Sequence, residues 1–202
     1  MAVSWTRHRF SGGTLALDAA NTVVYRGDPM RTFDRFDNPG EIASFAAAAT
    51  GFRAAELAHR QLAVPDPRAI HATVLTIREA TDRLFRGAVS SGALEAAALP
   101  PFLRACADGI EGGARETHSR GVSANSAKEL IAFEAALAAS ALALLPEQNY
   151  RRIRICPNCN WLFLDRSRNA SRLWCDMAVC GNRQKARRHY RRSKGLKEVY
   201  DA

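Results

Sequence analysis

The sequence predicts a mainly α-helical protein of the α+β class, with a helical N-terminal domain, a few short strands and a small C-terminal metal-binding module. Three observations support this prediction. The 202-residue chain is rich in alanine and only 8% aromatic, which favours helices. Several segments carry apolar residues at helical spacing behind clear start signals. Four of the five cysteines fall in one short stretch near the end. We place the N-terminal domain at residues 1–148 and the C-terminal module at residues 149–202.

A Gly-Gly turn at residues 12–13 and the apolar stretch 14–17 open the first domain. The stretch is too short for its periodicity to decide between a strand and a helical turn. Asp18, Asn21 and Thr22 follow at positions i, i+3 and i+4, so in a helix they share one face. Two interpretations of these polar residues stay open. They form either a structural network that holds the next loop, which we favour, or the lining of a ligand pocket.

Capping residues followed by proline, and glycine or proline stops, predict five helices in the rest of this domain. On the third helix Arg78, Asp82 and Arg86 are expected to lie opposite the apolar face. The last helix is the longest and is apolar around much of its girth. We therefore expect it at the centre of a bundle, leading directly into the C-terminal module. The five predicted helices span residues 39–50, 53–62, 67–88, 95–107 and 125–145.

Two further features of this domain are predicted from composition. Residues 108–125 are rich in glycine and weakly patterned, so we expect a loop or a short hairpin there. Cys106 has no Cys or His neighbour close in sequence, which favours a buried core residue over a ligand or nucleophile.

The C-terminal cysteines have the spacing of a metal site. Cys156 and Cys159 form a C-x2-C pair, and after fifteen residues Cys175 and Cys180 form a C-x4-C pair. Two close pairs at this separation indicate a tetrahedral site of four thiolates that holds one structural zinc ion. Such a site has no open coordination position, so it is not expected to be catalytic.

The elements around the cysteines predict a treble-clef arrangement. Strands are expected at residues 152–155, 161–164 and 172–174, with a tight cysteine-bearing turn between the first two. A helix over residues 183–193 follows the last ligand, and Ala186 and Tyr190 are expected to dock it against that turn. So small a module cannot fold by apolar burial alone, and zinc binding of roughly 10–16 kcal/mol supplies the missing stability.

The excess positive charge is confined to this module. Residues 151–202 hold 14 of the 29 Lys and Arg but only 4 of the 20 Asp and Glu, a net charge of +10. The preceding 150 residues therefore have a net charge of −1. A neutral domain followed by a basic module indicates a polyanionic partner.

The predicted C-terminal helix is where nucleic acid is expected to bind. Its like charges repel one another, and a phosphate backbone neutralises them. Arginine also makes bidentate contacts with phosphate and guanine. We expect DNA as the partner, with RNA as the alternative and a merely solvated basic face as the third interpretation. The residues expected to contact nucleic acid are Arg166, Arg168, Arg172, Arg183, Lys185, Arg187, Arg188, Arg191 and Arg192.

Two stretches resemble known families. The pattern C-P-x-C-x-W-L-F-L-D-x-S-R-N-x-S-R-x-W-C-x-M-x-x-C-G-N-R-x-K-A-R-R-H-Y resembles the CGNR-type zinc finger, named for residues 180–183. The pattern F-x-G-G-x-L-x-L-D-x-x-N-T at residues 10–22 resembles the ABATE domain that precedes this finger in many bacterial proteins. Ala19 and Ala20 stand where that motif usually has bulkier residues.

The resemblance implies a transcription regulator of bacterial stress responses. It implies a DNA-binding treble-clef finger and an N-terminal domain that binds an unidentified small molecule. The zinc ligands that it implies are Cys156, Cys159, Cys175 and Cys180.

Other functions are not expected. The N-terminus lacks the apolar run of a signal peptide, and the most apolar window, residues 130–145, is shorter than the roughly 20 residues of a membrane span. We expect a cytoplasmic protein without membrane attachment, associated with the nucleoid if it binds DNA. Asp18, His59, His71 and His118 have no catalytic spacing, so an enzyme is not expected. No heptad pattern indicates an oligomeric state.

Overall fold

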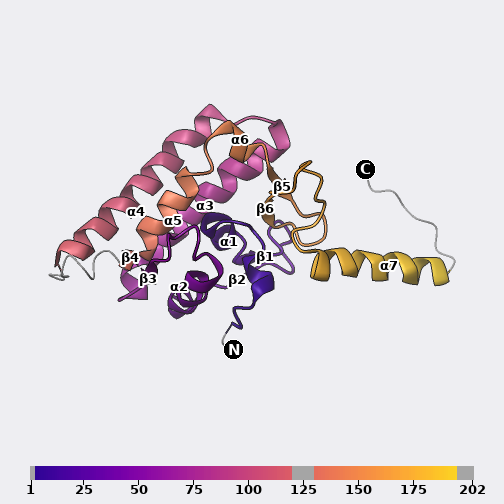
Figure 1. Ribbon diagram of the computed structural model, residues 1–202, viewed down its shortest axis with the longest axis horizontal. Helices are drawn as coiled ribbons and strands as arrows, with labels where there is room; N and C mark the ends of the chain where they lie inside the picture. The colour runs from indigo at the N-terminus through magenta and orange to yellow at the C-terminus, as the bar shows by residue number, and fades with distance from the viewer. Residues whose placement is uncertain (1–2, 120–129, 195–202) are drawn as a thin grey trace.

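The computed structural model describes residues 3–119 and 130–194, which form a helical body from which one helix projects (Figure 1). Single 3-10 turns lie at Arg7–Phe10 and Ala96–Ala98, and a π-helical turn at Met177–Gly181 precedes the last helix. The strands are β1 (Val23–Val24), β2 (Phe33–Asp34), β3 (Gln61–Ala63), β4 (Leu130–Ala132), β5 (Ile153–Ile155) and β6 (Leu162–Leu164). The helices are α1 (Leu15–Ala20), α2 (Gly40–Phe52), α3 (Pro67–Ser91), α4 (Leu99–Ser119), α5 (Phe133–Leu142), α6 (Glu147–Tyr150) and α7 (Asn182–Ser193).

Local capping explains where two of the helices begin. Thr14 precedes α1, and its Oγ1 accepts a hydrogen bond from the Leu17 N–H at 3.3 Å, so this stretch is a helix rather than a strand. Asp66 Oδ1 accepts hydrogen bonds from two N–H groups in the first turn of α3, at 2.9 and 3.3 Å. The helix ends at Gly92, whose φ of 82° is left-handed. The start predicted for α3 is confirmed.

α5 is the central helix of the body. α1, α3 and α4 all pack against it, and its residues are buried on most sides. Phe133, the first residue of α5, makes an edge contact with Phe45 of α2, with ring centroids 5.9 Å apart. The predicted central position is confirmed, although the helix is shorter than expected.

Two helix predictions are wrong because tertiary pairing overrides local propensity. Residues 53–59 form turns in which Ala58 and His59 have φ values of 50° and 61°, and β3 follows after residue 60. β3 pairs in parallel with β4, which occupies the described start of the segment predicted as the longest helix. Residues 125–129 of that predicted helix lie outside the described residues. A parallel pair between segments so far apart leaves no local signal.

The glycine-rich segment predicted as a loop is also helical, as far as the structure describes it. α4 continues to Ser119, and its glycines bring α4 close to α5. A Cβ at Gly109 would lie 2.6 Å from Ile77 Cδ1 and 3.1 Å from the Glu134 carbonyl oxygen. Glycine is therefore present here for close packing and not for a turn. Cys106 of α4 is buried, as predicted.

The expectation that Arg78 and Asp82 lie opposite the apolar face of α3 is wrong. They are only 3% and 5% exposed. Arg78 donates to both carboxylate oxygens of Asp34 on β2, at 2.7 and 2.6 Å, and to the Thr22 hydroxyl at 3.1 Å. This buried ion pair fixes the β1–β2 hairpin on α3.

The β5–β6 hairpin belongs to two apolar cores at once. Leu162 and Leu164 of β6 pack with the core of the helical body, together with Ile153 of β5. Phe163, on the opposite face of β6, packs with Trp161 and the cysteines of the C-terminal module. One strand thus joins the helical body to the module that follows it.

Candidate metal centre and nucleic-acid interface

Four cysteine side chains converge beside the β5–β6 hairpin. Cys156 and Cys159 lie in the turn between the strands, Cys175 in a bend and Cys180 in the π-helical turn. The Cys175 Sγ lies 3.6 Å from the sulfurs of both Cys159 and Cys180, and all four sulfurs lie within 4.8 Å of one another. Zn–S bonds of about 2.3 Å in a tetrahedron place sulfurs about 3.8 Å apart. The four cysteines therefore fit one structural zinc ion.

The electrostatics of the four thiols are consistent with a bound cation. Hydrogen bonding with Cys156 is the largest cause that raises the pKa of Cys159 and of Cys175, and burial raises both further. Thiolates packed this closely repel one another in a buried site. A zinc ion replaces the shared protons and compensates the charge of the thiolates.

Backbone hydrogen bonds shape the turn that carries the first two ligands. The Cys156 N–H donates to the Trp161 carbonyl at 2.9 Å, and the Asn160 N–H donates to the Cys156 carbonyl at 2.8 Å. Asn160 has a left-handed φ of 61°, which asparagine tolerates better than most residues. These contacts hold the C-x2-C turn in a closed conformation that brings its two cysteines to the same site.

Asp165 organises the loop between the two cysteine pairs. It is fully buried, and its carboxylate accepts hydrogen bonds from the N–H groups of Ser167 at 2.9 Å and Arg172 at 2.8 Å. Burial by itself would raise the pKa of Asp165, but these hydrogen bonds outweigh it and lower the pKa below the ordinary value. The predicted strand at residues 172–174 is wrong: these residues have no regular secondary structure and no strand partner in the described chain.

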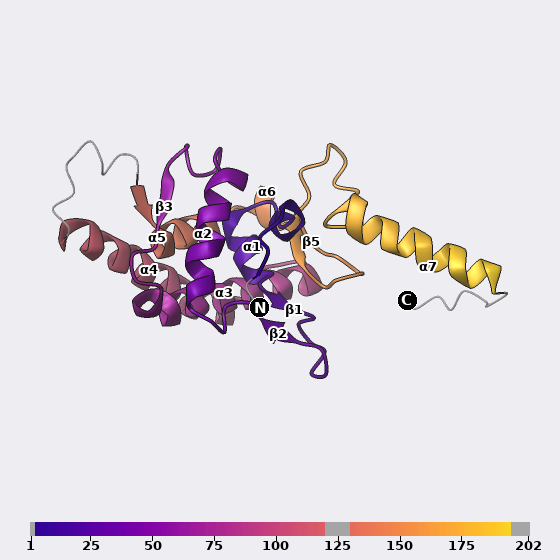
Figure 2. The same cartoon turned by 90° about the horizontal axis from the view of Figure 1, so that it is seen from below.

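α7 extends from the metal centre into solvent (Figures 1 and 2). It has no buried residue, and the prediction that Ala186 and Tyr190 dock it against the cysteine turn is wrong, since Tyr190 is 59% exposed. Among the elements that the structure describes, the one that packs extensively against it is the preceding π-helical turn. Among the side chains of residues 3–115 and 130–194, its basic groups have no carboxylate partner within ion-pair distance. These are Arg183, Lys185, Arg187, Arg188, Arg191 and Arg192.

The three loop arginines predicted to contact nucleic acid differ from one another. Arg166 and Arg168 are exposed beside the metal module. The Arg172 guanidinium instead donates to the Cys175 carbonyl at 2.6 Å and lies 5.1 Å from the Phe163 ring centroid. Arg172 therefore holds the loop against the module.

The polar trio near the N-terminus forms a structural network that reaches the metal module. Asp18 accepts hydrogen bonds from Arg53 Nε at 2.6 Å and from the Gly12 N–H at 2.8 Å. Burial raises the pKa of Asp18 to about 7, although the charge of Arg53 opposes the rise. Asn21 donates to the Leu162 carbonyl at 2.8 Å and accepts from the Leu162 N–H at 2.9 Å. The Thr22 hydroxyl donates a hydrogen bond to the Ala19 carbonyl and accepts one from the Arg78 guanidinium.

The adjacent glycine turn docks on the same strand. The Gly12 carbonyl accepts a hydrogen bond from the Leu164 N–H at 2.8 Å. Gly13 has a φ of 93°, and a Cβ there would lie 3.2 Å from Leu164 Cβ. The motif F-x-G-G-x-L-x-L-D-x-x-N-T therefore explains how the helical body holds β6, and its Asp18, Asn21 and Thr22 side chains have partners within the protein.

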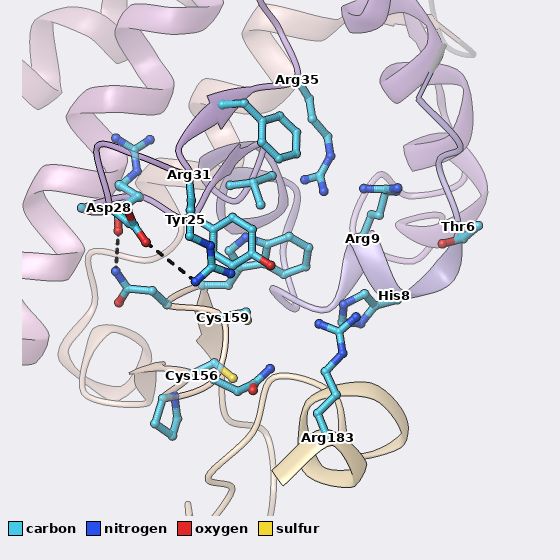
Figure 3. A pocket seen from close by; sticks show the side chains of 18 of the residues that line it. Thr6, His8, Arg9, Tyr25, Asp28, Arg31, Arg35, Cys156, Cys159 and Arg183 are labelled. Carbon is cyan, nitrogen blue, oxygen red and sulfur yellow. Dashed lines mark hydrogen bonds and ion pairs between the residues drawn. The ribbon is translucent and has the colours of Figure 1, made fainter. Parts of the chain in front are cut away.

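A cavity at the junction was not anticipated from sequence. It has a volume of about 750 Å³ and lies between the N-terminal segment, the β1–β2 hairpin, the cysteine turn and the start of α7 (Figure 3). His8 closes one side by stacking on Trp161 at 5.3 Å and bonding Asp176 at 3.1 Å. Arg9 and Arg35 also line it. In the sequence, Arg9 and Arg35 are recognisable only as positive charges in a nearly neutral domain. That observation does not reveal that they lie close to the metal module.

Comparisons with known proteins agree with this geometry where they match. No helix in the described ranges is long and apolar enough to cross a membrane. No curated protein and no solved structure matches the chain. Residues 152–193 match the family model of the CGNR zinc finger, a span that includes the β5–β6 hairpin, all four cysteines and α7. The metal centre and the basic helix thus form a CGNR zinc finger, whereas the likeness of residues 10–22 to the ABATE domain stays a prediction.

Proposed function

We propose that the protein is a DNA-binding transcription regulator whose zinc finger contacts DNA through α7. The observation that carries this proposal is an exposed helix with six basic side chains, none paired with a carboxylate of the described chain, fixed to a metal centre. Such a helix attracts phosphates, and its binding free energy depends on the number of counterions that it displaces from the nucleic acid.

The dimensions of α7 suit duplex DNA. Its 12 residues span about 18 Å, and the major groove, about 12 Å wide, admits an α-helix. Arg183, Arg187 and Arg191 follow one another at helical spacing, so one stripe of the helix offers guanidinium groups to phosphate or guanine. Tyr190 and the neighbouring His189 are the two rings of α7, which gives little platform for stacking single-stranded bases.

The remaining parts of the proposal rest on the layout and on the resemblance. A cysteine turn, a β-hairpin and a helix that begins just after the last ligand match the plan of a treble clef. The helical body fits a regulatory domain that senses a small molecule, as the likeness to the ABATE domain implies. A regulator of this kind acts in the bacterial cytoplasm, at the nucleoid.

The test is binding of the zinc-loaded full chain to duplex DNA and to duplex RNA of the same sequence, followed by fluorescence anisotropy. We expect tighter binding to DNA and its loss when a chelator removes zinc. The double variant Arg188→Gln/Arg192→Gln should bind at least about tenfold more weakly, since each phosphate contact contributes to affinity.

The matched control is Arg68→Gln/Arg115→Gln, which removes the same charge from exposed positions on α3 and α4. If both double variants weakened DNA binding equally, the loss of affinity would come from the change in net charge. That result would contradict an interface on α7. Preference for RNA would instead assign the finger to RNA binding.

A further inference from the structure

The junction cavity contains more positive charge than its own carboxylates neutralise. Arg26 pairs with Glu79 at 2.6 Å, and Arg31 lies 3.7 Å from Asp28, so these two lining arginines have acidic partners. Four other lining arginines have no carboxylate within ion-pair distance in the described chain. They are Arg9, Arg35, Arg183 and Arg187.

The unpaired arginines come from both units and converge on the same space. Arg35 and Arg9 reach the cavity from the helical body, and Arg183 rises toward it from the start of α7 (Figure 3). Arg187 lies one turn further along α7. A group bound here would contact the body and the finger together.

Arg35 is held in an orientation that suits an anion. Its guanidinium carbon lies 5.6 Å from the Phe33 ring centroid and 5.5 Å from that of Trp161. Partial burial, and then the charge of Arg9, lowers the pKa of Arg35 to about 10. Aromatic rings beside a guanidinium restrict its orientation, while its N–H groups still point outward in the guanidinium plane, where an anion can accept from them. Two cations placed so close together without a carboxylate destabilise the protein unless an anion binds between them.

The metal centre alone does not account for these arginines. A zinc ion with four thiolates has a net charge of about −2, and Cys156 and Cys159 line the cavity. Four unpaired arginines outnumber that charge. Within the described residues, moreover, no arginine side chain donates a hydrogen bond to a cysteine sulfur.

We propose that this cavity binds a small multivalent anion, a molecule carrying several phosphate or carboxylate groups, between Arg9 and Arg35 of the helical body and Arg183 and Arg187 of α7. The cavity volume of about 750 Å³ admits a molecule of metabolite size. This inference names the class of ligand for the ligand-sensing part of the proposed function. It rests on that function only for the effect of the anion on the finger. The anion links α7 to the body and so fixes the direction in which the finger presents its other basic residues, Lys185, Arg188, Arg191 and Arg192.

The test is calorimetric titration of the zinc-loaded full chain, in low salt and without DNA. The probes are fructose 1,6-bisphosphate for phosphate groups and tricarballylate for carboxylates, with fructose as the uncharged comparison. We expect saturable binding of at least one anion and none of fructose, and the stronger anion identifies the preferred group. The variant Arg35→Gln should weaken binding at least about tenfold, since a charge-assisted hydrogen bond is lost.

The control variant is Arg68→Gln, which removes one exposed charge on α3 far in sequence from the cavity residues and should change the affinity less than about twofold. If Arg35→Gln does not fold, Arg9→Gln makes the same test. Absence of saturable binding by either anion, or equal weakening by Arg35→Gln and Arg68→Gln, would overturn the proposal. The proposal would also be overturned if neither anion bound in the titration while Arg35→Gln weakened duplex binding in the separate anisotropy assay, because the cavity would then be part of the nucleic-acid surface. The titration contains no DNA, so a failure of DNA binding does not affect its result.

Discussion

At the scale of single residues, Asn21 makes the contact that most directly joins the helical body to the zinc finger. Its amide forms two hydrogen bonds with the backbone of Leu162, and both residues are buried. Asn21→Ala leaves the N–H and the carbonyl of Leu162 without these partners. We expect the free energy of unfolding to fall by about 1–3 kcal/mol, measured by urea denaturation.

Asn169→Ala is the control for this prediction. Asn169 is exposed in the loop between the cysteine pairs, so its loss should change the free energy of unfolding by less than about 0.5 kcal/mol. Equal effects of the two variants would show that Asn21 does not hold β6.

The residues that sequence could identify were those whose chemistry is local. Cys156, Cys159, Cys175 and Cys180 were predictable because the spacing of close cysteine pairs reflects the geometry of one metal ion. Arg35 was not predictable as a lining residue, because its position depends on how the β1–β2 hairpin meets a turn more than a hundred residues later in the chain.

At the scale of elements, α7 is a helix under electrostatic strain. Arg183, Arg187 and Arg191 are spaced four residues apart, and each like-charge pair at this spacing costs about 0.2–0.5 kcal/mol. A helix of 12 residues with no buried face is marginally stable on its own. Polyanions should therefore stabilise it.

We expect the helical circular dichroism signal of the zinc-loaded chain to increase when sulfate or duplex DNA is added. Sodium chloride at the same ionic strength is the comparison, since it screens charges without a multivalent contact. The Arg188→Gln/Arg192→Gln variant should show a smaller increase. An unchanged signal with DNA would mean that α7 is already fully formed, or that DNA does not bind it.

Elements that depend on residues close in sequence could be predicted, whereas elements that depend on distant partners could not. The start of α3 was predicted because Asp66 and Pro67 act within one turn. The pairing of β3 with β4 and the glycine-mediated approach of α4 to α5 depend on partners distant in sequence. For the same reason, the segment at residues 53–62 was wrongly predicted as a helix.

At the scale of the whole molecule, the finger and the helical body share a core. Because Ile153, Leu162 and Leu164 pack with the body, the metal that orders the finger also supports the helices. We expect thermal unfolding, followed by circular dichroism, to show one transition with zinc bound. Chelation under reducing conditions should lower its midpoint by at least about 10 °C, since 1 kcal/mol corresponds to about 2–4 °C for a chain of this size. A helical transition that does not respond to chelation would contradict the shared core.

The central claim, that α7 binds the phosphates of DNA, is tested most directly by the salt dependence of duplex binding. The affinity of the zinc-loaded chain is measured over a series of salt concentrations. If the six basic residues of α7 each neutralise one phosphate, the logarithm of affinity falls with the logarithm of salt with a slope of about −5. Arg188→Gln/Arg192→Gln should make that slope shallower by about 2, while Arg68→Gln/Arg115→Gln should leave it unchanged. An affinity that does not change with salt concentration, or equal slopes for the wild type and the α7 variant, would contradict the account.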